Sequence, residues 1–356
     1  MNRRQLLQVS VAATTLGLAA CNGTASQKAG EQASSASTSP NATTSAATAS
    51  GSSSTSSKPV LGLTYIPNVQ FAPFYWGVDK GVFAAGGQDI ALRHHGAQEG
   101  LFTALAAGQE QYVIAGGDEL VQAFTEGMEL VSIATMYQHY PVRVIVPEDS
   151  TITDLTGLKG KRLGIPGKFG EAWFGTLVAL NTARLTQDDV TIQTIGYTSQ
   201  AALTTGKVDA VVGYTNNDAV QFEQNGLAVR ELELAPEVPL VAVSLITTFE
   251  HLKANREEAQ AVAKAMVESM RAVAADPEAA VTVAATHVTG LDEATARKNA
   301  LATLKATVPL YESDGEITGA IVERTWGNMT TFMKAQGLID KAVDGASMID
   351  PLVLAS

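Results

Sequence analysis

Aromatic side chains stand unusually close together after the first apolar segment of the chain. Asn68 is followed, within a chain that is only 6% aromatic, by Phe71, Phe74, Tyr75 and Trp76. Aromatic rings stack on planar ligands, while an amide can pair with ring carbonyls or hydroxyls. The group therefore predicts a platform for a planar ligand, contacted by Asn68, Phe71, Phe74 and Tyr75. The alternative interpretation is that Phe71 and Phe74 fill the core beneath the first helix.

Further polar and aromatic side chains follow later strands. Ligands of open α/β sheets bind at the carboxyl ends of the strands, so residues at those ends are expected to converge. Asp118 follows a glycine pair after the apolar segment 112–115, although capping of the next helix would also explain it. The glycine-rich turn at 167–170 leads into a helix whose first backbone N–H groups can bind a ligand oxygen. The remaining candidates for ligand contact are Tyr137, Phe169, Glu171, Trp173, Tyr214, Asn216 and Asn217.

The elements that must position these residues form two similar runs of strands alternating with helices. The expected strands are 60–65, 89–93, 112–115, 130–136, 162–166, 191–195 and 208–214. Such alternation is typical of α/β lobes with mainly parallel sheets. Segments 142–146 and 237–246 are predicted to cross between two lobes. Amphipathic helices, predicted to pack on the first lobe, are expected at 255–275, 277–286, 292–305 and 317–336.

The composition excludes several classes of function. A net charge of −12 without any Lys/Arg run argues against nucleic acid as a partner. The single cysteine, Cys21, excludes disulfides within the chain and cysteine-based zinc sites. The adjacent His94 and His95 would point to opposite faces of a strand, so they make a poor metal-binding pair. The sequence contains no hydrolase or metalloprotease motif, and it predicts no catalytic residue, metal or cofactor.

The amino-terminal residues carry targeting signals. Residues 1–20 combine two arginines with a short apolar stretch and small residues, which is typical of a signal peptide. Leu-Ala-Ala-Cys at 18–21 resembles the bacterial lipobox. Cys21 is therefore predicted to carry acyl chains that hold the protein to the membrane without spanning it. Residues 21–58 are rich in Ser, Thr and Ala, and they are predicted to be a disordered tether.

Several sequence patterns resemble those of one protein family. The chain resembles the NMT1/THI5-like solute-binding proteins of ABC importers in Tyr-Ile-Pro-Asn at 65–68, Leu-Lys-Gly-Lys-Arg-Leu-Gly-Ile-Pro-Gly at 158–167 and Gly-Lys-Val-Asp-Ala at 206–210. The resemblance implies an α/β, two-lobed periplasmic-binding-protein fold of type II, with a ligand cleft between the lobes. The patterns at 70–74, 115–118 and 213–217 are most similar to the riboflavin-binding branch. Fungal pyrimidine synthases of the same superfamily use a cysteine-rich motif, which this chain lacks.

The residues and the resemblance together predict a lipid-anchored binding protein on the extracytoplasmic face of the cell membrane. Its transported ligand would be riboflavin. A thiamin-precursor pyrimidine is the alternative, and an extracytoplasmic enzyme is less favoured. The resemblance implies two partners, the transmembrane permease subunit and the ATP-binding subunit of an importer, and the chain itself is expected to be a monomer. The first lobe is expected to comprise 59–145 and 243–356, and the second 146–242.

Overall fold

Two five-stranded sheets organise the chain. The computed structural model describes residues 58–96 and 99–353. The predicted signal peptide, Cys21 and the predicted tether up to residue 57 lie outside these residues. The described residues belong to one compact unit. None of the helices within them is long and apolar enough to cross a membrane.

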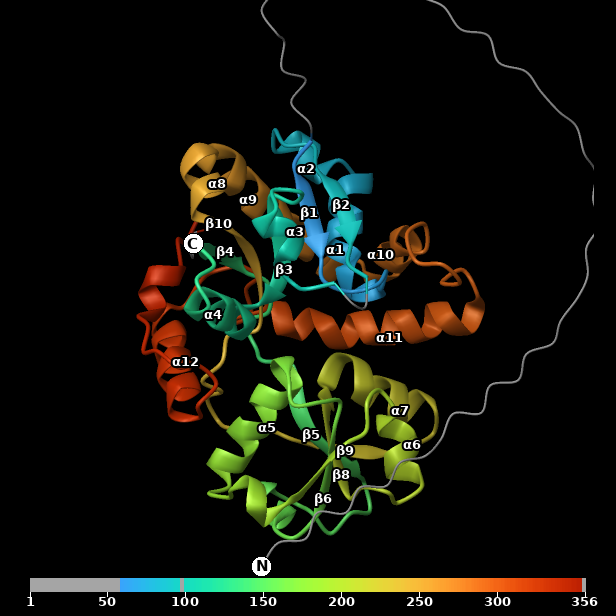
Figure 1. The fold of residues 1–356 in the computed structure, drawn as a ribbon. Coiled ribbons are helices and arrows are strands. Elements are labelled where there is room, and N and C mark those ends of the chain that lie inside the picture. Colours follow the sequence, from blue (N-terminus) through green and yellow to red (C-terminus); the bar gives the residue numbers. More distant parts are fainter. Residues whose placement is uncertain (1–57, 97–98, 354–356) are drawn as a thin grey trace, which may run out of the picture. The chain divides into compact units, whose positions relative to one another are not determined.

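The first sheet has the strand order β2-β1-β3-β10-β4 (Figure 1). Its strands are β1 (Val60–Leu63), β2 (Ala91–His94), β3 (Tyr112–Gly116), β4 (Leu130–Thr135) and β10 (Val243–Thr248). Strand β1 pairs in parallel with β2 and β3, whereas β10 runs antiparallel between β3 and β4. Strands β3 and β4 are buried along their whole length. Their continuous apolar runs fit strands covered on both faces.

The second sheet repeats this order as β7-β6-β8-β5-β9. Its strands are β5 (Val142–Pro147), β6 (Arg162–Ile165), β7 (Thr191–Thr194), β8 (Ala210–Tyr214) and β9 (Val229–Leu232), of which β9 is missing from the sequence predictions. Strand β5 lies antiparallel between β8 and β9. The expected lobe boundary at 145/146 falls inside β5, so the chain already passes between the sheets at 136–141. Below, residues 58–135 with 243–353 are the first lobe, and residues 142–232 the second.

Helices lie around both sheets (Figure 1). The α-helices are α1 (Ala72–Asp79), α2 (Val82–Ala85), α3 (Thr103–Ala106), α4 (Gly117–Thr125), α5 (Gly170–Thr182), α6 (Ser199–Thr204), α7 (Val220–Gln224), α8 (Phe249–Ala254), α9 (Arg256–Ala275), α10 (Pro277–Ala284), α11 (Ala294–Tyr311) and α12 (Glu323–Ala335). Short 3-10 turns are η1 (Val69–Phe71), η2 (Leu155–Leu158), η3 (Gln187–Asp189) and η5 (Gly345–Met348), and η4 (Thr215–Ala219) is a π-helical turn.

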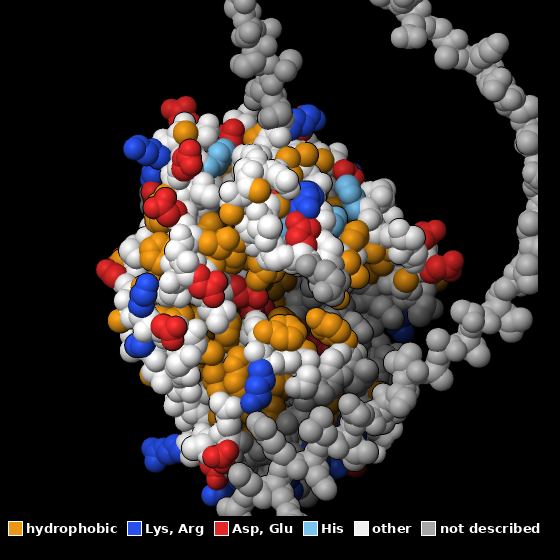
Figure 2. Space-filling model, in the orientation of Figure 1, with side chains coloured by type: hydrophobic (Ala, Val, Ile, Leu, Met, Phe, Trp, Pro, Cys, Tyr) orange, Lys and Arg blue, Asp and Glu red, His pale blue; other side chains and the backbone are white. Residues whose placement is uncertain are grey.

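Helix α11 connects the two lobes. The sequence predicts that it packs on the first lobe, where it contacts η1, α9 and α10. It also contacts η4 and α7 in the second lobe, which the sequence does not predict. Figure 1 shows it running between the two sheets. On the face seen in Figure 2, hydrophobic and acidic side chains gather around a hollow at the level of this helix. Helical periodicity indicates that one side of α11 is buried, but it does not identify the surfaces that bury it.

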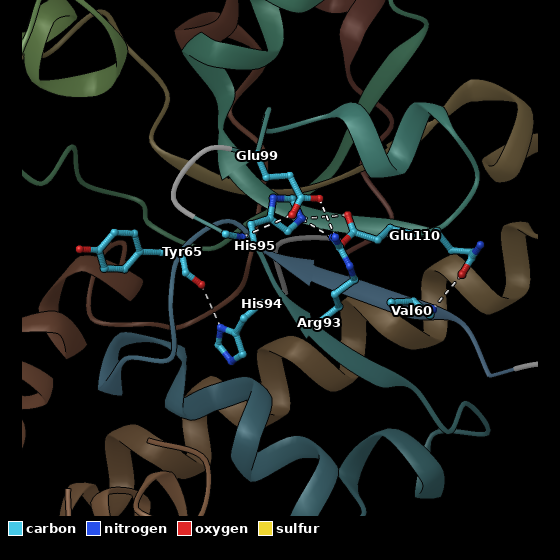
Figure 3. A network of polar contacts seen from close by, with 9 residues as sticks. Val60, Tyr65, Arg93, His94, His95, Glu99 and Glu110 are labelled. Carbon is cyan, nitrogen blue, oxygen red and sulfur yellow. Dashed lines mark hydrogen bonds and ion pairs between the residues drawn. The ribbon is translucent and has the colours of Figure 1, made fainter. Parts of the chain in front are cut away.

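A buried ion-pair network fixes the edge of the first sheet (Figure 3). The carboxylate of Glu110 is fully buried, and it pairs with Arg93 Nη1 at 2.7 Å and with His95 Nε2 at 2.9 Å. Arg93 also pairs with Glu99 at 2.7 Å. A buried charge is stable only when it is paired and hydrogen-bonded, as here. The network therefore holds Arg93 of β2, His95 and Glu99 around Glu110.

The neighbouring His94 holds the aromatic loop. Its Nδ1 lies 2.9 Å from the carbonyl oxygen of Tyr65, and its Nε2 lies 3.0 Å from the Tyr75 hydroxyl. The Tyr75 hydroxyl also accepts a hydrogen bond from the backbone N–H of Asn68, at 3.3 Å. His94 and His95 thus have separate partners, as expected for neighbours on a strand.

We expect Gly62→Ala to destabilise the protein. A Cβ at position 62 of β1 would lie 2.5 Å from Glu110 Cδ. Because Arg93 and His95 hold Glu110, the carboxylate cannot move aside without breaking buried pairs. The expected loss in the free energy of unfolding is about 1–3 kcal/mol, as for other overpacked cores, and urea unfolding would measure it.

Gly327→Ala is the matched control for this substitution. Gly327 lies inside α12, and a Cβ there would meet no other atom within 4 Å. Alanine favours a helix over glycine by about 0.5–1 kcal/mol, so this variant should be as stable as the wild type or slightly more so. If the Gly62→Ala variant is as stable as the wild type, the network around Glu110 is not rigid.

Candidate functional site

A buried polar cluster joins the two lobes. Asp118, in the first turn of α4, is fully buried. The Tyr140 hydroxyl lies 2.7 Å from Asp118 Oδ2 and 3.0 Å from the backbone oxygen of Glu171. Tyr140 belongs to the segment that connects the sheets, while Glu171 begins α5 in the second lobe. One hydroxyl therefore contacts both lobes at the carboxyl ends of their strands, where open α/β sheets bind ligands.

A third carboxyl, that of Glu119, completes the cluster. Its Oε2 accepts a hydrogen bond from the backbone N–H of Gly116 at 3.1 Å, so Glu119, and not Asp118, caps the start of α4. Asp118 Oδ1 accepts a hydrogen bond from the backbone N–H of Glu119 at 2.8 Å. Glu119 Oε1 faces Gly170, at 3.4 Å from the position of a Cβ there. Glu119 thus reaches the first turn of α5, where the helix dipole favours negative charge.

The three carboxyls hold protons more tightly than free carboxyls do. Burial, reinforced by the charges of Glu171 and Glu119, raises the pKa of Asp118 well above its usual range. Burial and then the charge of Glu119 raise the pKa of Glu171 to about 8. Burial also raises the pKa of Glu119. The cluster therefore keeps at least one proton at neutral pH, because full ionisation would bury adjacent negative charges.

Aromatic and amide groups adjoin the carboxyls. Tyr137 lies near both Tyr311 and Glu171. Its ring centroid is 5.8 Å from that of Tyr311. Burial, and to a smaller extent the charge of Glu171, raise the pKa of Tyr137. Asn216, 1% exposed, donates from Nδ2 to Thr307 Oγ1 in α11 at 3.0 Å. It stands in the π-helical turn η4, and such turns occur often at functional sites.

Three buried polar atoms in this region have no hydrogen-bond partner: Glu171 Oε1, Asn216 Oδ1 and the Tyr311 hydroxyl. Leaving a buried polar atom unpaired costs about 1–3 kcal/mol, so most buried groups are paired in folded proteins. Unpaired atoms of residues that lie around Tyr137 on different elements can instead pair with a ligand. The arrangement can therefore bind a molecule that offers both donors and acceptors.

The aromatic loop forms a second group, separate from the carboxyls. Asn68 caps η1, where its side chain accepts a hydrogen bond from the Gln70 backbone. Phe71 meets His94 edge-on at 5.5 Å, and Tyr75 stacks on His287 at 4.3 Å. Their contact with a ligand stays a prediction. Phe74 is fully buried in the core, which favours the alternative interpretation for that residue.

The remaining predicted residues lie in the second lobe. Trp173 is buried, and the Lys168 ammonium lies 5.1 Å from its ring centroid. Phe169 is 64% exposed, so in this arrangement its ring faces solvent. Tyr214, at the end of β8, lies close enough to Glu171 to favour the ionised form of that carboxyl. Asn217 accepts a hydrogen bond from Gln221, one turn further along.

Sequence analysis misses three members of the site. Glu119 and Tyr140 each follow a predicted candidate, so adjacency to Asp118 and the Tyr-x-x-Tyr spacing after Tyr137 were the available signals. No sequence signal pointed to Tyr311, because it lies at the end of α11, far along the chain from the other site residues. Within the described residues, no group of three His, Cys, Asp or Glu side chains is arranged to hold a metal ion.

A cavity of about 430 Å³ opens beside η4, between α11 and the second sheet. Its polar lining comes from His139, Arg143, Thr215, Glu223 and Glu231. None of the three carboxyls lines this cavity, which adjoins Thr215 of η4 and Leu310 of α11. The cavity therefore opens where α11 meets the second lobe, beside the neighbours in sequence of Asn216 and Tyr311.

The chain is similar to proteins of known name over both lobes. It is 29% identical over 299 residues to the riboflavin-binding protein RibY of Chloroflexus aurantiacus, covering 82% of this chain and 84% of that one. It is also 27% identical over 153 residues to the 4-amino-5-hydroxymethyl-2-methylpyrimidine phosphate synthase of Uromyces fabae, covering 43% of this chain and 44% of that one.

Solved structures share the fold. The periplasmic aliphatic sulphonate binding protein SsuA of Escherichia coli aligns with a TM-score of 0.67 at 18% identity, over 82% of this chain and 98% of that one. This similarity confirms the two-lobed α/β fold of periplasmic binding proteins. The family model described as NMT1/THI5 like matches residues 68–280. The chain belongs to the NMT1/THI5-like family.

Proposed function

We propose that this protein is the solute-binding component of an ABC importer and that its ligand is riboflavin, a planar heteroaromatic vitamin. The observation that carries the proposal is the set of unpartnered polar atoms between the lobes, on Glu171, Asn216 and Tyr311. Glu171 and Asn216 belong to the second lobe and Tyr311 to α11 of the first, so a ligand between them would bridge the lobes and favour their closed arrangement.

The site chemistry fits a flavin better than an anion. Carboxyls, phenols and an amide make up the cluster, and within the described residues it has no lysine or arginine side chain to neutralise a sulfonate or nitrate. A three-ring system with a polyhydroxyl chain needs aromatic surfaces and several polar partners, and Tyr137, Trp173 and Tyr214 with Asn216 supply both. The 29% identity to a riboflavin-binding protein over most of both chains supports the same choice.

A thiamin-precursor pyrimidine is the second candidate ligand. The similarity to a pyrimidine phosphate synthase favours it. We do not extend the synthase activity to this chain, because its single cysteine, Cys21, cannot supply the cysteine-rich motif of those enzymes. The proposal is therefore a binding protein without catalytic residues.

Membrane attachment and partners complete the proposal. Acyl chains on Cys21 would hold the protein on the extracytoplasmic face of the cell membrane. A monomer would deliver riboflavin to the transmembrane permease, and an ATP-binding subunit would drive import. The lipobox-like sequence at 18–21 supports the anchor.

We expect riboflavin fluorescence to be quenched when the purified protein is added, because a stacked ring loses emission. Trp173→Ala and Tyr214→Ala should each weaken binding by about 1–3 kcal/mol, as for bases stacked on aromatic side chains. Titration of riboflavin fluorescence measures both effects, and circular dichroism checks that the variants fold.

Tyr197→Ala is the control, because Tyr197 is 85% exposed and lies outside the cluster. It should bind riboflavin as the wild type does. Calorimetry that shows tight binding of a formylaminopyrimidine, with riboflavin inert, would replace riboflavin by the second candidate.

Cys21→Ser should release the protein from the membrane fraction, because serine cannot form the thioether to the lipid. Riboflavin binding by the released protein should not change, since Cys21 is not among the residues predicted to contact the ligand. Fractionation in high salt followed by immunoblotting tests this. A variant that still sediments with membranes would contradict lipid anchoring.

A further inference from the structure

Glu171 stands out among the buried groups of the site. It is 8% exposed, and its Oε1 has no partner. A second unpartnered acceptor, Asn216 Oδ1, belongs to a residue 1% exposed on η4. Tyr137 links the two, because Asn216 lowers its pKa while the charge of Glu171 raises it. Two residues with unpaired buried acceptors thus lie near Tyr137, on different elements of the second lobe.

The groups around Glu171 are mostly acids or phenols. Helix α4 presents Asp118 and Glu119, the connecting segment presents Tyr137 and Tyr140, and β8 presents Tyr214. The charged residue of β5, Arg143, donates to the backbone carbonyls of Tyr140 and Val142. Turn η2 carries no titratable side chain.

These surroundings favour a neutral Glu171. Burial first, and then the charge of Glu119, raise the pKa of Glu171 to about 8, while Tyr214 lowers it. The α5 dipole also favours the ionised form, but its effect is smaller than that of burial. Glu171 is therefore mostly protonated at pH 7 and mostly ionised at pH 9.

Protonation changes what Glu171 can recognise. An ionised carboxylate only accepts hydrogen bonds, whereas a protonated carboxyl offers a donor and an acceptor side by side. The edge of a flavin ring presents an N–H next to a carbonyl, which is the complementary pair. A site that hydrogen-bonds such an edge rejects ligands that lack it, because its buried groups would stay unpaired.

We propose that Glu171 is a specificity-determining residue that binds, in its protonated form, a ring edge with adjacent N–H and C=O groups. This inference rests on the proposed function, in that it takes a planar heterocycle as the ligand. It adds that the ligand edge is an imide or amide and that binding depends on one proton held by the cluster.

The test measures riboflavin affinity from pH 6 to pH 9 by fluorescence. The apparent affinity is reduced by the fraction of protein in the binding-competent form. With a Glu171 pKa of about 8, the wild type should bind about 10-fold more weakly at pH 9 than at pH 7. Glu171→Gln should lack this decline, because its amide keeps a donor and an acceptor and does not titrate. Glu171→Ala should bind weakly at every pH.

Glu268→Gln is the matched control. It makes the same carboxyl-to-amide change at an exposed position within α9, so it should keep the wild-type pH profile. A decline that persists in Glu171→Gln, or a wild type that binds more tightly at pH 9 than at pH 7, would overturn the inference while leaving riboflavin as the ligand.

A second measurement uses the ligand-free protein. When folding raises the pKa of a carboxyl, that carboxyl does not destabilise the protein at a pH below its pKa in the unfolded chain. The free energy of unfolding then falls as the pH rises from the unfolded pKa to the folded pKa. The wild-type Tm should therefore fall between pH 5 and pH 8, and Glu171→Gln should reduce that slope. If Tm falls with pH equally in the wild type and in Glu171→Gln, the inference that Glu171 is protonated is overturned. Riboflavin that binds at no pH overturns the proposed function instead, whatever this slope shows.

Discussion

Each sheet depends on one antiparallel strand that arrives from the other lobe. Strand β5 enters the second sheet between β8 and β9, and β10 returns to the first sheet between β3 and β4. Two chain segments therefore join the lobes. This double connection limits their relative motion to bending at a few residues. It also places the first connecting segment, with Tyr137 and Tyr140, beside the ends of both sheets, where the carboxyl cluster forms.

The carboxyl cluster shows how the fold sustains an unfavourable electrostatic arrangement. Raising the pKa of Glu171 from an ordinary 4.5 to about 8 corresponds to a cost on the order of 5 kcal/mol for the ionised form. The Tyr140 hydroxyl and the backbone N–H of Glu119 offset part of the burial cost of Asp118. Stability of the fold alone would not favour buried carboxyls whose ionised form is so unfavourable. Strongly shifted carboxyls between two lobes are typical of functional sites.

Local sequence patterns were sufficient to predict the sheets but not the surroundings of the site. Apolar runs such as Leu130–Thr135 identify buried strands because burial on both faces requires them. Strand β9 escaped prediction because it is short and mostly half-exposed, so no apolar run marks it. Asp118 and Glu171 were found at strand ends, whereas Tyr311 was not, since no local pattern encodes contact between residues so distant in the chain.

The order of strands along the chain has a consequence for folding during synthesis. All strands of the second lobe lie in one continuous stretch, so its sheet can form as soon as β9 has emerged. The first lobe must wait for β10, the strand between β3 and β4. Until then, β3 and β4 each present an unpaired apolar edge, and such edges are prone to pair with other chains. The later-made strand therefore completes the earlier-made lobe, and the interval between them is when the nascent chain is most exposed to aggregation.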